Sequence, residues 1–158
     1  MQDGINFDSF SIELQVAVVA VRKAAVEIQQ RNIAGSERNN DGGINDYVTI
    51  WDTVGQEMIT SEIRSKFPND TIIGEESPSY SEESVRAERL WVIDPIDGTA
   101  NARAQRKYSF ISLGFIQNGQ SAAGVVYDPY HDELFYGESG RGSFMNGQKI
   151  CVGNVVDG

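Results

Sequence analysis

Residues 108–150 contain a series of short strand-like runs separated by turns, and this pattern constrains the fold more than any other feature of the sequence. The runs are YSFISLGFI, SAAGVVY, ELFYG and GSFM, and the turns between them fall at Asn118-Gly119, Asp128 to Asp132 and Gly140 to Gly142. Asn-Gly is a strong hairpin signal because both residues tolerate a positive φ angle, and Asn146-Gly147 is a second example. The pattern predicts an antiparallel β-meander.

Two helices are predicted ahead of the meander. The first is indicated by apolar residues at helical spacing, with Asp8 or Ser9 as its expected cap: Leu14, Val18, Val21, Ala25 and Ile28. The polar run from Gly35 to Gly43 is expected to be a loop, and DYVTIWD to be a short extended piece. The second helix is indicated by a further apolar set and should end near Phe67-Pro68: Val54, Met58, Ile59 and Ile63.

Two more strands are predicted between the second helix and the meander. TIIGEES should form a strand that breaks at Gly74, and LWVID should form the next one, with a polar insertion between them that includes a helical turn from Glu82. The chain of 158 residues fits one domain, so residues 1–158 are predicted to form a single domain. The expected fold class is α+β, with two N-terminal helices packed on a largely antiparallel sheet and no βαβ repeat.

The charge and cysteine content limit the classes of partner. A net charge of -10 argues against nucleic acids and anionic membranes as partners, although an acidic chain can bind phosphate where metal ions lie between. Cys151 is the single cysteine, so no internal disulfide can form and a reducing cytoplasm is favoured. The N-terminus has no signal-peptide pattern, and no run approaches the roughly 18 apolar residues of a membrane span. We expect a cytoplasmic protein without a membrane partner.

Three carboxylates are expected at one edge of the predicted sheet. Glu75 follows the strand TIIG, while Asp94 and Asp97 follow LWVI. Carboxylates that are crowded at an edge repel one another unless a cation lies between them, and hard oxygen ligands of this kind select Mg²⁺, Mn²⁺ or Ca²⁺. The proline between the two aspartates stiffens the turn, so both side chains, and also the carbonyl of Ile96, are expected to point at one centre.

Gly98 and Thr99 follow directly and indicate a phosphate site. If a helix begins here, its first backbone N–H groups are free, and a helix N-terminus beside a divalent cation attracts a phosphate. Thr99 is also placed to hold a water molecule. The strand is therefore expected to end in a combined metal and phosphate site.

Each of these features also has a purely structural interpretation. D-x-x-D followed by Gly-Thr can be an Asx-type turn that caps a helix, and Glu75-Glu76 can be a solvated strand edge. Asp52, taken alone, is expected to be the N-cap of the second helix. His131 is expected to lie at the surface, and Cys151 to be an inert, small apolar side chain.

WVIDPIDGTAN resembles the first signature of the inositol monophosphatase family, in which D-P-[IL]-D-G-T follows an apolar strand and an Asn lies two positions after the Thr. DYVTIWD is similar to the family's D-x-V-T-x-x-D, and TIIGEES to its I-x-G-E-E-S. GVVYDP and GSFMNGQKI resemble later strands of its sheet. The blocks occur in the family's order over roughly Asp46 to Ile150, and they imply the N-terminal half of the sugar phosphatase fold.

The resemblance implies specific roles for the residues in these blocks. The implied metal ligands are Glu75, Asp94, Asp97 and the carbonyl of Ile96. Asp52 and Thr99, with Glu75 through its metal, would orient and deprotonate the attacking water, and the amides of Gly98 and Thr99 would hold the phosphate. The implied reaction is Mg²⁺-dependent hydrolysis of a phosphate monoester, an inositol or related sugar phosphate, by direct in-line attack of water.

The sequence also departs from the family pattern. Ala102 replaces the family's usual aromatic residue and Lys107 its usual proline, and the family's second half, with a further metal-binding Asp in a W-D motif, is not found in these residues. The sequence leaves open an expressed fragment, a truncated gene product and a shortened relative. It therefore leaves two hypotheses, an active phosphatase and a catalytically impaired module that binds metal or self-associates. Exposed sheet surface would favour a homo-oligomer such as a homodimer.

Overall fold

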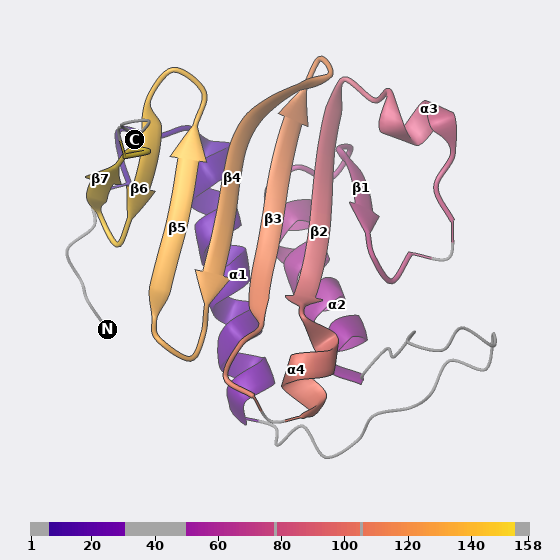
Figure 1. The fold of residues 1–158 in the computed structure, drawn as a ribbon. Coiled ribbons are helices and arrows are strands. Elements are labelled where there is room, and N and C mark those ends of the chain that lie inside the picture. Colours follow the sequence, from indigo (N-terminus) through magenta and orange to yellow (C-terminus); the bar gives the residue numbers. More distant parts are fainter. Residues whose placement is uncertain (1–6, 31–49, 78, 105, 154–158) are drawn as a thin grey trace, which may run out of the picture.

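The computed structural model describes residues 7–30, 50–77, 79–104 and 106–153, and its main feature is one seven-stranded sheet with strand order β1 to β7. The helices α1 and α2 lie on one face of this sheet (Figure 1). The elements are α1 (Ile12–Gln30), α2 (Ile50–Lys66), β1 (Thr71–Gly74), α3 (Glu82–Val85), β2 (Arg89–Asp97), α4 (Thr99–Arg103), β3 (Phe110–Gln117), β4 (Gln120–Asp128), β5 (Glu133–Glu138), β6 (Gly142–Met145) and β7 (Gln148–Ile150). The α+β fold predicted from the sequence is confirmed.

The predicted meander forms as expected. Each strand from β2 to β6 pairs antiparallel with the next one. At the first Asn-Gly turn the φ angles are 52° for Asn118 and 75° for Gly119, and at the second they are 46° for Asn146 and 85° for Gly147. Positive φ at both central residues is the requirement of a type I′ hairpin, so the turn chemistry explains where these strands reverse.

The sequence did not predict the relative direction of β1 and β2. β1 and β2 are parallel, with Gly74 opposite Ile93, and the segment that contains α3 carries the chain back between them. A parallel pair needs a long connection of this kind. The pairing places the C-terminal ends of β1 and β2 at the same edge of the sheet.

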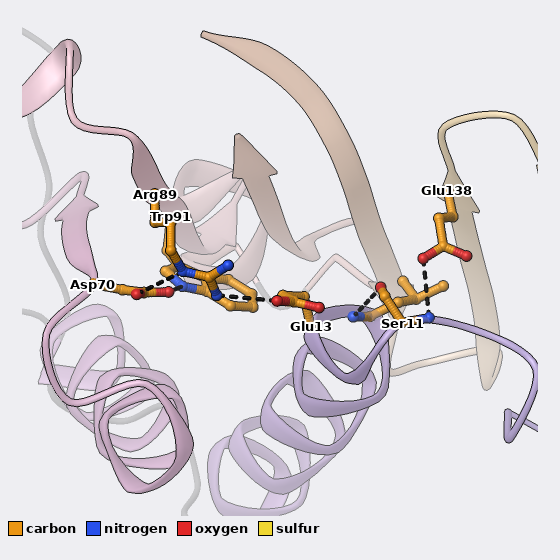
Figure 2. A network of polar contacts seen from close by, with 7 residues as sticks. Ser11, Glu13, Asp70, Arg89, Trp91 and Glu138 are labelled. Atoms are coloured by element: carbon orange, nitrogen blue, oxygen red, sulfur yellow. Dashed lines mark hydrogen bonds and ion pairs between the residues drawn. The ribbon is translucent and has the colours of Figure 1, made fainter. Parts of the chain in front are cut away.

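The core lies between the helices and the sheet. Its side chains alternate along the strands and recur at helical spacing in α1 and α2, and the fully buried members include Leu14, Val21, Ile59, Ile63, Trp91 and Ile93. Trp51 is also buried, and Met58 packs against the core. α1 begins after Ser11, whose hydroxyl accepts the N–H of Leu14 at 3.3 Å (Figure 2). The expected caps, Asp8 and Ser9, were wrong because the helix begins nearer to its first core residue.

A polar network holds the start of β2 against α1 (Figure 2). Asp70 accepts hydrogen bonds from Arg89 Nε and Trp91 Nε1, both at 2.8 Å. Arg89 also donates to Glu13 of α1 at 3.0 Å, and its guanidinium lies over the rings of Phe67 and Phe115. The network fixes β2 at its N-terminal end, and the carboxylates predicted to bind metal follow at its other end.

The face of the sheet that points away from α1 and α2 carries apolar side chains that remain exposed. Val92 is 40% exposed and Val126 39% exposed, and both alternate with core residues of β2 and β4. These two valines line a groove of about 520 Å³ that also includes Asp94, Phe135, Phe144 and Ile150. The predicted loop from Gly35 to Gly43 and the residues Asp46 to Thr49 lie outside the described residues.

Candidate metal and phosphate site

The parallel pairing of β1 and β2 brings Glu75 beside Asp94. Gly74 is in register with Ile93, and the N–H of Glu75 donates to the carbonyl of Ile93 at 3.1 Å. Glu75, which follows β1, and Asp94, which lies within β2, are therefore at the same level of the sheet. The prediction that these two carboxylates meet there depends on strand direction, which the sequence pattern did not supply.

The chain bends between Asp94 and Asp97. The regular register of β2 with β3 is interrupted between these residues and resumes where Asp97 pairs with Phe110. Asp94 Oδ1 accepts the N–H of Ile96 at 3.1 Å, which forms an Asx-type turn. Contrary to the structural interpretation of the sequence, this turn does not cap a helix, because the N-cap of α4 is Gly98 without a side-chain cap hydrogen bond. The turn and the proposed ligand role are compatible, because a carboxylate has further lone pairs for other partners.

The pKa of Asp94 shows that this side chain interacts with the other two carboxylates predicted to bind metal, Glu75 and Asp97. The pKa of Asp94 is raised to about 7, and burial is the largest cause. The charge of Glu75, a hydrogen bond with Glu75 and the charge of Asp97 also raise this pKa, whereas the hydrogen bond from the N–H of Ile96 lowers it. Neighbouring carboxylates that cannot all ionise take up a proton or a cation.

The donor atoms around Asp94 fit a hard divalent cation. Within the described part of the chain, no three acidic, histidine or cysteine side chains already lie close enough to enclose an ion. The oxygens of Glu75, Asp94, Asp97 and Ile96 are nevertheless of the type that Mg²⁺ prefers. Burial, together with the charges of Glu75 and Asp97, disfavours the ionised form of Asp94, and a bound cation would offset both effects.

Asp52 reaches the same corner from α2. It is fully buried in the first turn of α2, two residues inside the helix, so the N-cap interpretation from the sequence was wrong. Thr99 Oγ1 lies 3.2 Å from Asp52 Oδ1 and 3.0 Å from the carbonyl oxygen of Ile96, so its single hydroxyl proton can be donated to either acceptor or shared between them. Asp52, Ile96 and Thr99 are therefore brought together, as the resemblance implied.

Gly98 forms the N-cap of the short helix α4, which follows the C-terminal end of β2 (Figure 1). Its φ angle is 86°, and a Cβ atom there would lie 3.1 Å from the carbonyl oxygen of Tyr108, so only glycine fits without strain. The carbonyl of Gly98 accepts the N–H groups of Asn101 and Ala102 at 2.8 and 3.1 Å. Phosphate binding by the amides of Gly98 and Thr99 stays a prediction.

Sequence reasoning missed Gln56, which supports the turn that carries Glu75. Gln56 Oε1 accepts the N–H of Glu76 at 3.1 Å, and a Cβ atom on Gly74 would lie only 1.8 Å from that oxygen. One available signal was the neighbouring Gly55, since a glycine inside a helical pattern often marks close packing. A Cβ atom on Gly55 would lie 3.1 Å from Pro95 Cβ.

Two other residues considered from the sequence lie apart from this site. The side chain of His131 is 57% exposed and Nδ1 lies 2.8 Å from Asp128 Oδ2, which agrees with the expected surface position. Cys151 is exposed and follows β7, and its expected inertness stays a prediction.

Comparison with known proteins places these observations in a family. The model of the inositol monophosphatase family matches residues 6–156. Inositol monophosphatase 1 of Rattus norvegicus is 40% identical over 71% of this chain and 41% of its own length. A fructose-1,6-bisphosphatase/inositol-1-monophosphatase of Thermotoga maritima is 42% identical over 70% of this chain and 41% of its own length.

The solved structures agree with the sequence relatives. An inositol monophosphatase from Thermotoga maritima superposes with a TM-score of 0.81 at 34% identity, over 92% of this chain and 55% of the other. The chain thus spans about half the length of the proteins that it matches. On the extent of the family match and on this common fold, the chain belongs to the inositol monophosphatase family.

Proposed function

We propose that the protein is an Mg²⁺-dependent phosphate monoester hydrolase that acts on an inositol phosphate or a related sugar phosphate. The observation that carries the proposal is the meeting of Glu75, just after β1, with Asp94 in the parallel strand β2, where the charge of Asp97 also acts on Asp94. Family membership supports a phosphatase of the inositol phosphate type.

The metal would be held by oxygens of four residues, namely Glu75, Asp94, Asp97 and the carbonyl of Ile96. When bound, Mg²⁺ supplies Lewis-acid stabilisation of the charge on the phosphoryl oxygens and makes water more acidic. The carbonyl oxygen of Ile96 lies 3.0 Å from Thr99 Oγ1, and at least one of its two lone pairs is left for a cation.

Asp52 and Thr99 would orient and deprotonate the attacking water. Thr99 Oγ1 can accept a hydrogen bond from water while its own proton is donated to Asp52 Oδ1, 3.2 Å away. Burial of Asp52 keeps bulk water from competing for that proton. The amides of Gly98 and Thr99 would then bind the phosphate in line with this water.

Phosphate release tests the proposal directly. The 158-residue chain is assayed with inositol 1-phosphate and Mg²⁺, beside Asp94→Asn and the exposed control Glu88→Gln. We expect turnover by the original chain and by Glu88→Gln, and a loss of about 100-fold or more in Asp94→Asn, as is typical when an electrostatic group at a reacting centre is removed. Equal activity in all three proteins would contradict the site.

A second candidate function is a catalytically impaired member that binds metal or associates with itself. The uncovered apolar face of the sheet favours it, because faces of this kind are usually covered by protein. We propose a second copy of this chain as the partner that covers this face, since β3 and β4 contribute no acidic residue to it before Asp128. Absence of turnover together with self-association would favour this function.

The remaining partner assignments are also proposals. None of the described helices is long and apolar enough to cross a membrane. The net charge of -10 supports a small phosphate ester rather than a nucleic acid or an anionic membrane as the partner. We place the protein in the cytoplasm on its single cysteine, and we retain one domain for residues 1–158.

A further inference from the structure

A cavity of about 170 Å³ lies beside the Pro95-Ile96 turn. The end of α1, the end of β2, α4 and the turn after β4 meet around it at one edge of the sheet (Figure 1). Its buried apolar wall residues include Ile28, Pro95, Ile96, Ala102 and Ile111. Ala102 has the smallest of these side chains, so it leaves space that a larger residue at this position would fill.

The polar side chains in the wall already have hydrogen-bond partners. The hydroxyl of Ser109, a buried residue, donates to the hydroxyl of Tyr130 at 3.3 Å, and Gln29 Nε2 donates to the carbonyl of Pro129. Within the described part of the chain, no charged residue lines the cavity. A charged molecule would lose its hydration here without gaining a partner of opposite charge, so the walls favour a neutral, apolar molecule.

The volume of the cavity corresponds to a single six-membered ring. An apolar cavity of about 150 Å³ in a protein interior is large enough to bind benzene. Gln29 belongs to the wall and is also exposed, so the cavity reaches the molecular surface beside this side chain. A small molecule can therefore enter there without unfolding of the core.

We propose that this cavity is a binding site for a small, neutral, apolar molecule of about the size of one aromatic ring. Ile96 is a wall residue and also carries a carbonyl proposed as a metal ligand, so a bound molecule would rest against the turn of the candidate metal site. The inference does not rest on the proposed function, because binding in the cavity needs neither metal nor turnover.

Nuclear magnetic resonance with benzene as the probe tests the site in the original chain. We expect saturable nuclear Overhauser effects between benzene and the methyl groups of Ile28, Ile96 and Ile111, which line the cavity. Effects to Val92 and Val126 instead would place benzene in the groove on the uncovered face of the sheet and would overturn the inference. A complete absence of saturable effects would overturn it as well.

Benzoate tests the chemical class of the ligand, because it carries the same ring with a negative charge. We expect benzoate to show an affinity at the three isoleucines at least about tenfold lower than that of benzene, since the carboxylate would lose its hydration in an apolar cavity. Equal affinities of the two molecules at these methyl groups would contradict the apolar class.

Variants test whether the empty space itself is the site. Ala102→Phe fills the cavity, and Ala104→Phe is the matched control at an exposed position just after α4. With benzene at about ten times its dissociation constant, we expect the melting temperature of the original chain and of Ala104→Phe to rise by roughly 3–6 °C. The rise should disappear in Ala102→Phe, and an unchanged rise in a folded Ala102→Phe would refute the site. Where this variant does not fold, the Overhauser effects in the original chain decide alone.

Discussion

Single side chains decide how this chain responds to pH, and Tyr127 is the clearest example. Its hydroxyl donates to Asp132 Oδ1 at 2.9 Å. Burial is the largest cause that raises the pKa of Tyr127 to about 12, and the hydrogen bond with Asp132 and the charge of Asp132 raise it further. The positive charge of Arg22 lowers this pKa. Ionisation of Tyr127 in the folded protein would remove the donor and place two negative charges side by side.

We therefore expect the folded state to lose stability between pH 10 and about pH 12. A raised pKa means that the folded state holds a proton which the unfolded chain releases near pH 10, so the stabilisation is complete below pH 10 and is lost as the pH rises. Tyr127→Phe should make the slope shallower by at most about 1.4 kcal/mol per pH unit. Urea unfolding between pH 8 and 12 measures this, and an unchanged slope would contradict it.

Ala102 leaves space behind the candidate site. It is buried, and it lines a cavity of about 170 Å³ with Ile28, Pro95, Ile111 and Tyr130 among its other walls. This is the position at which the family resemblance implied an aromatic residue. The empty volume lies on the apolar side of the Pro95-Ile96 turn, so it weakens the packing that holds the turn in place.

Filling this cavity should stabilise the protein. We expect Ala102→Phe to raise the free energy of unfolding by about 1–2 kcal/mol, from roughly 24 cal/mol per Å³ of cavity filled and a deduction for imperfect fit. The melting temperature should rise by about 2–8 °C. Ala104→Phe, an exposed position just after the same helix, is the control and should not stabilise. A destabilised Ala102→Phe would show that the cavity cannot accept the ring.

At the scale of elements, the placement of β2 depends on polar contacts at one end and on turn chemistry at the other. Asp70 is 8% exposed and joins Arg89 and Trp91 in one network (Figure 2). Because Arg89 also donates a hydrogen bond to Glu13 of α1, the network holds α1 in place as well. A change at Asp70 should therefore loosen both elements.

Asp70→Asn tests this coupling. The amide keeps one acceptor oxygen for the two donors, so we expect a loss of about 2 kcal/mol in the free energy of unfolding. Glu82→Gln is the matched control, because the pair of Glu82 with Arg86 spans 3.5 Å with side chains 90% and 80% exposed, and exposed pairs contribute little. Chemical denaturation of both variants gives the comparison. Equal losses would show that the Asp70 network does not hold β2.

The elements that the sequence predicted well are those with local causes. Asn118-Gly119 and Asn146-Gly147 determine their turns through their own backbone preferences, so the meander was predictable. The end of the second helix followed from Pro68. The parallel direction of β1 and β2 was not predictable, because it depends on how a connection returns across the sheet.

The candidate site also has some features that the sequence predicted and others that depend on contacts between distant residues. Glu75 and Asp94 were predicted as metal ligands because carboxylates follow two predicted strands, but their meeting depends on the parallel register of Gly74 with Ile93. Asp52 was identified through the family resemblance, since its own surroundings suggested only a helix cap. Gln56 was missed because its contact with the N–H of Glu76 joins residues far apart in the chain, and no local pattern encodes such a contact.

At the scale of the whole molecule, the sheet has one covered and one uncovered face. The helices α1 and α2 cover the first face (Figure 1), and the second presents Val92, Val126 and Ile150, each 39–40% exposed. Asp94 lines the same groove, so the candidate metal site borders the uncovered face. Whatever covers this face would also limit access of solvent to Asp94.

We expect the 158-residue chain to self-associate through this face, so that its average mass in solution rises with protein concentration. Val126→Lys should shift the equilibrium to the monomer, because a charge placed in the centre of the contact would be desolvated on association. Val19→Lys is the matched control, since Val19 is 41% exposed on α1, which packs on the opposite face of the sheet. Sedimentation equilibrium of the three proteins over a wide concentration range decides the matter. A monomeric original chain at every concentration, or dissociation caused equally by Val19→Lys, would exclude the uncovered face as the contact.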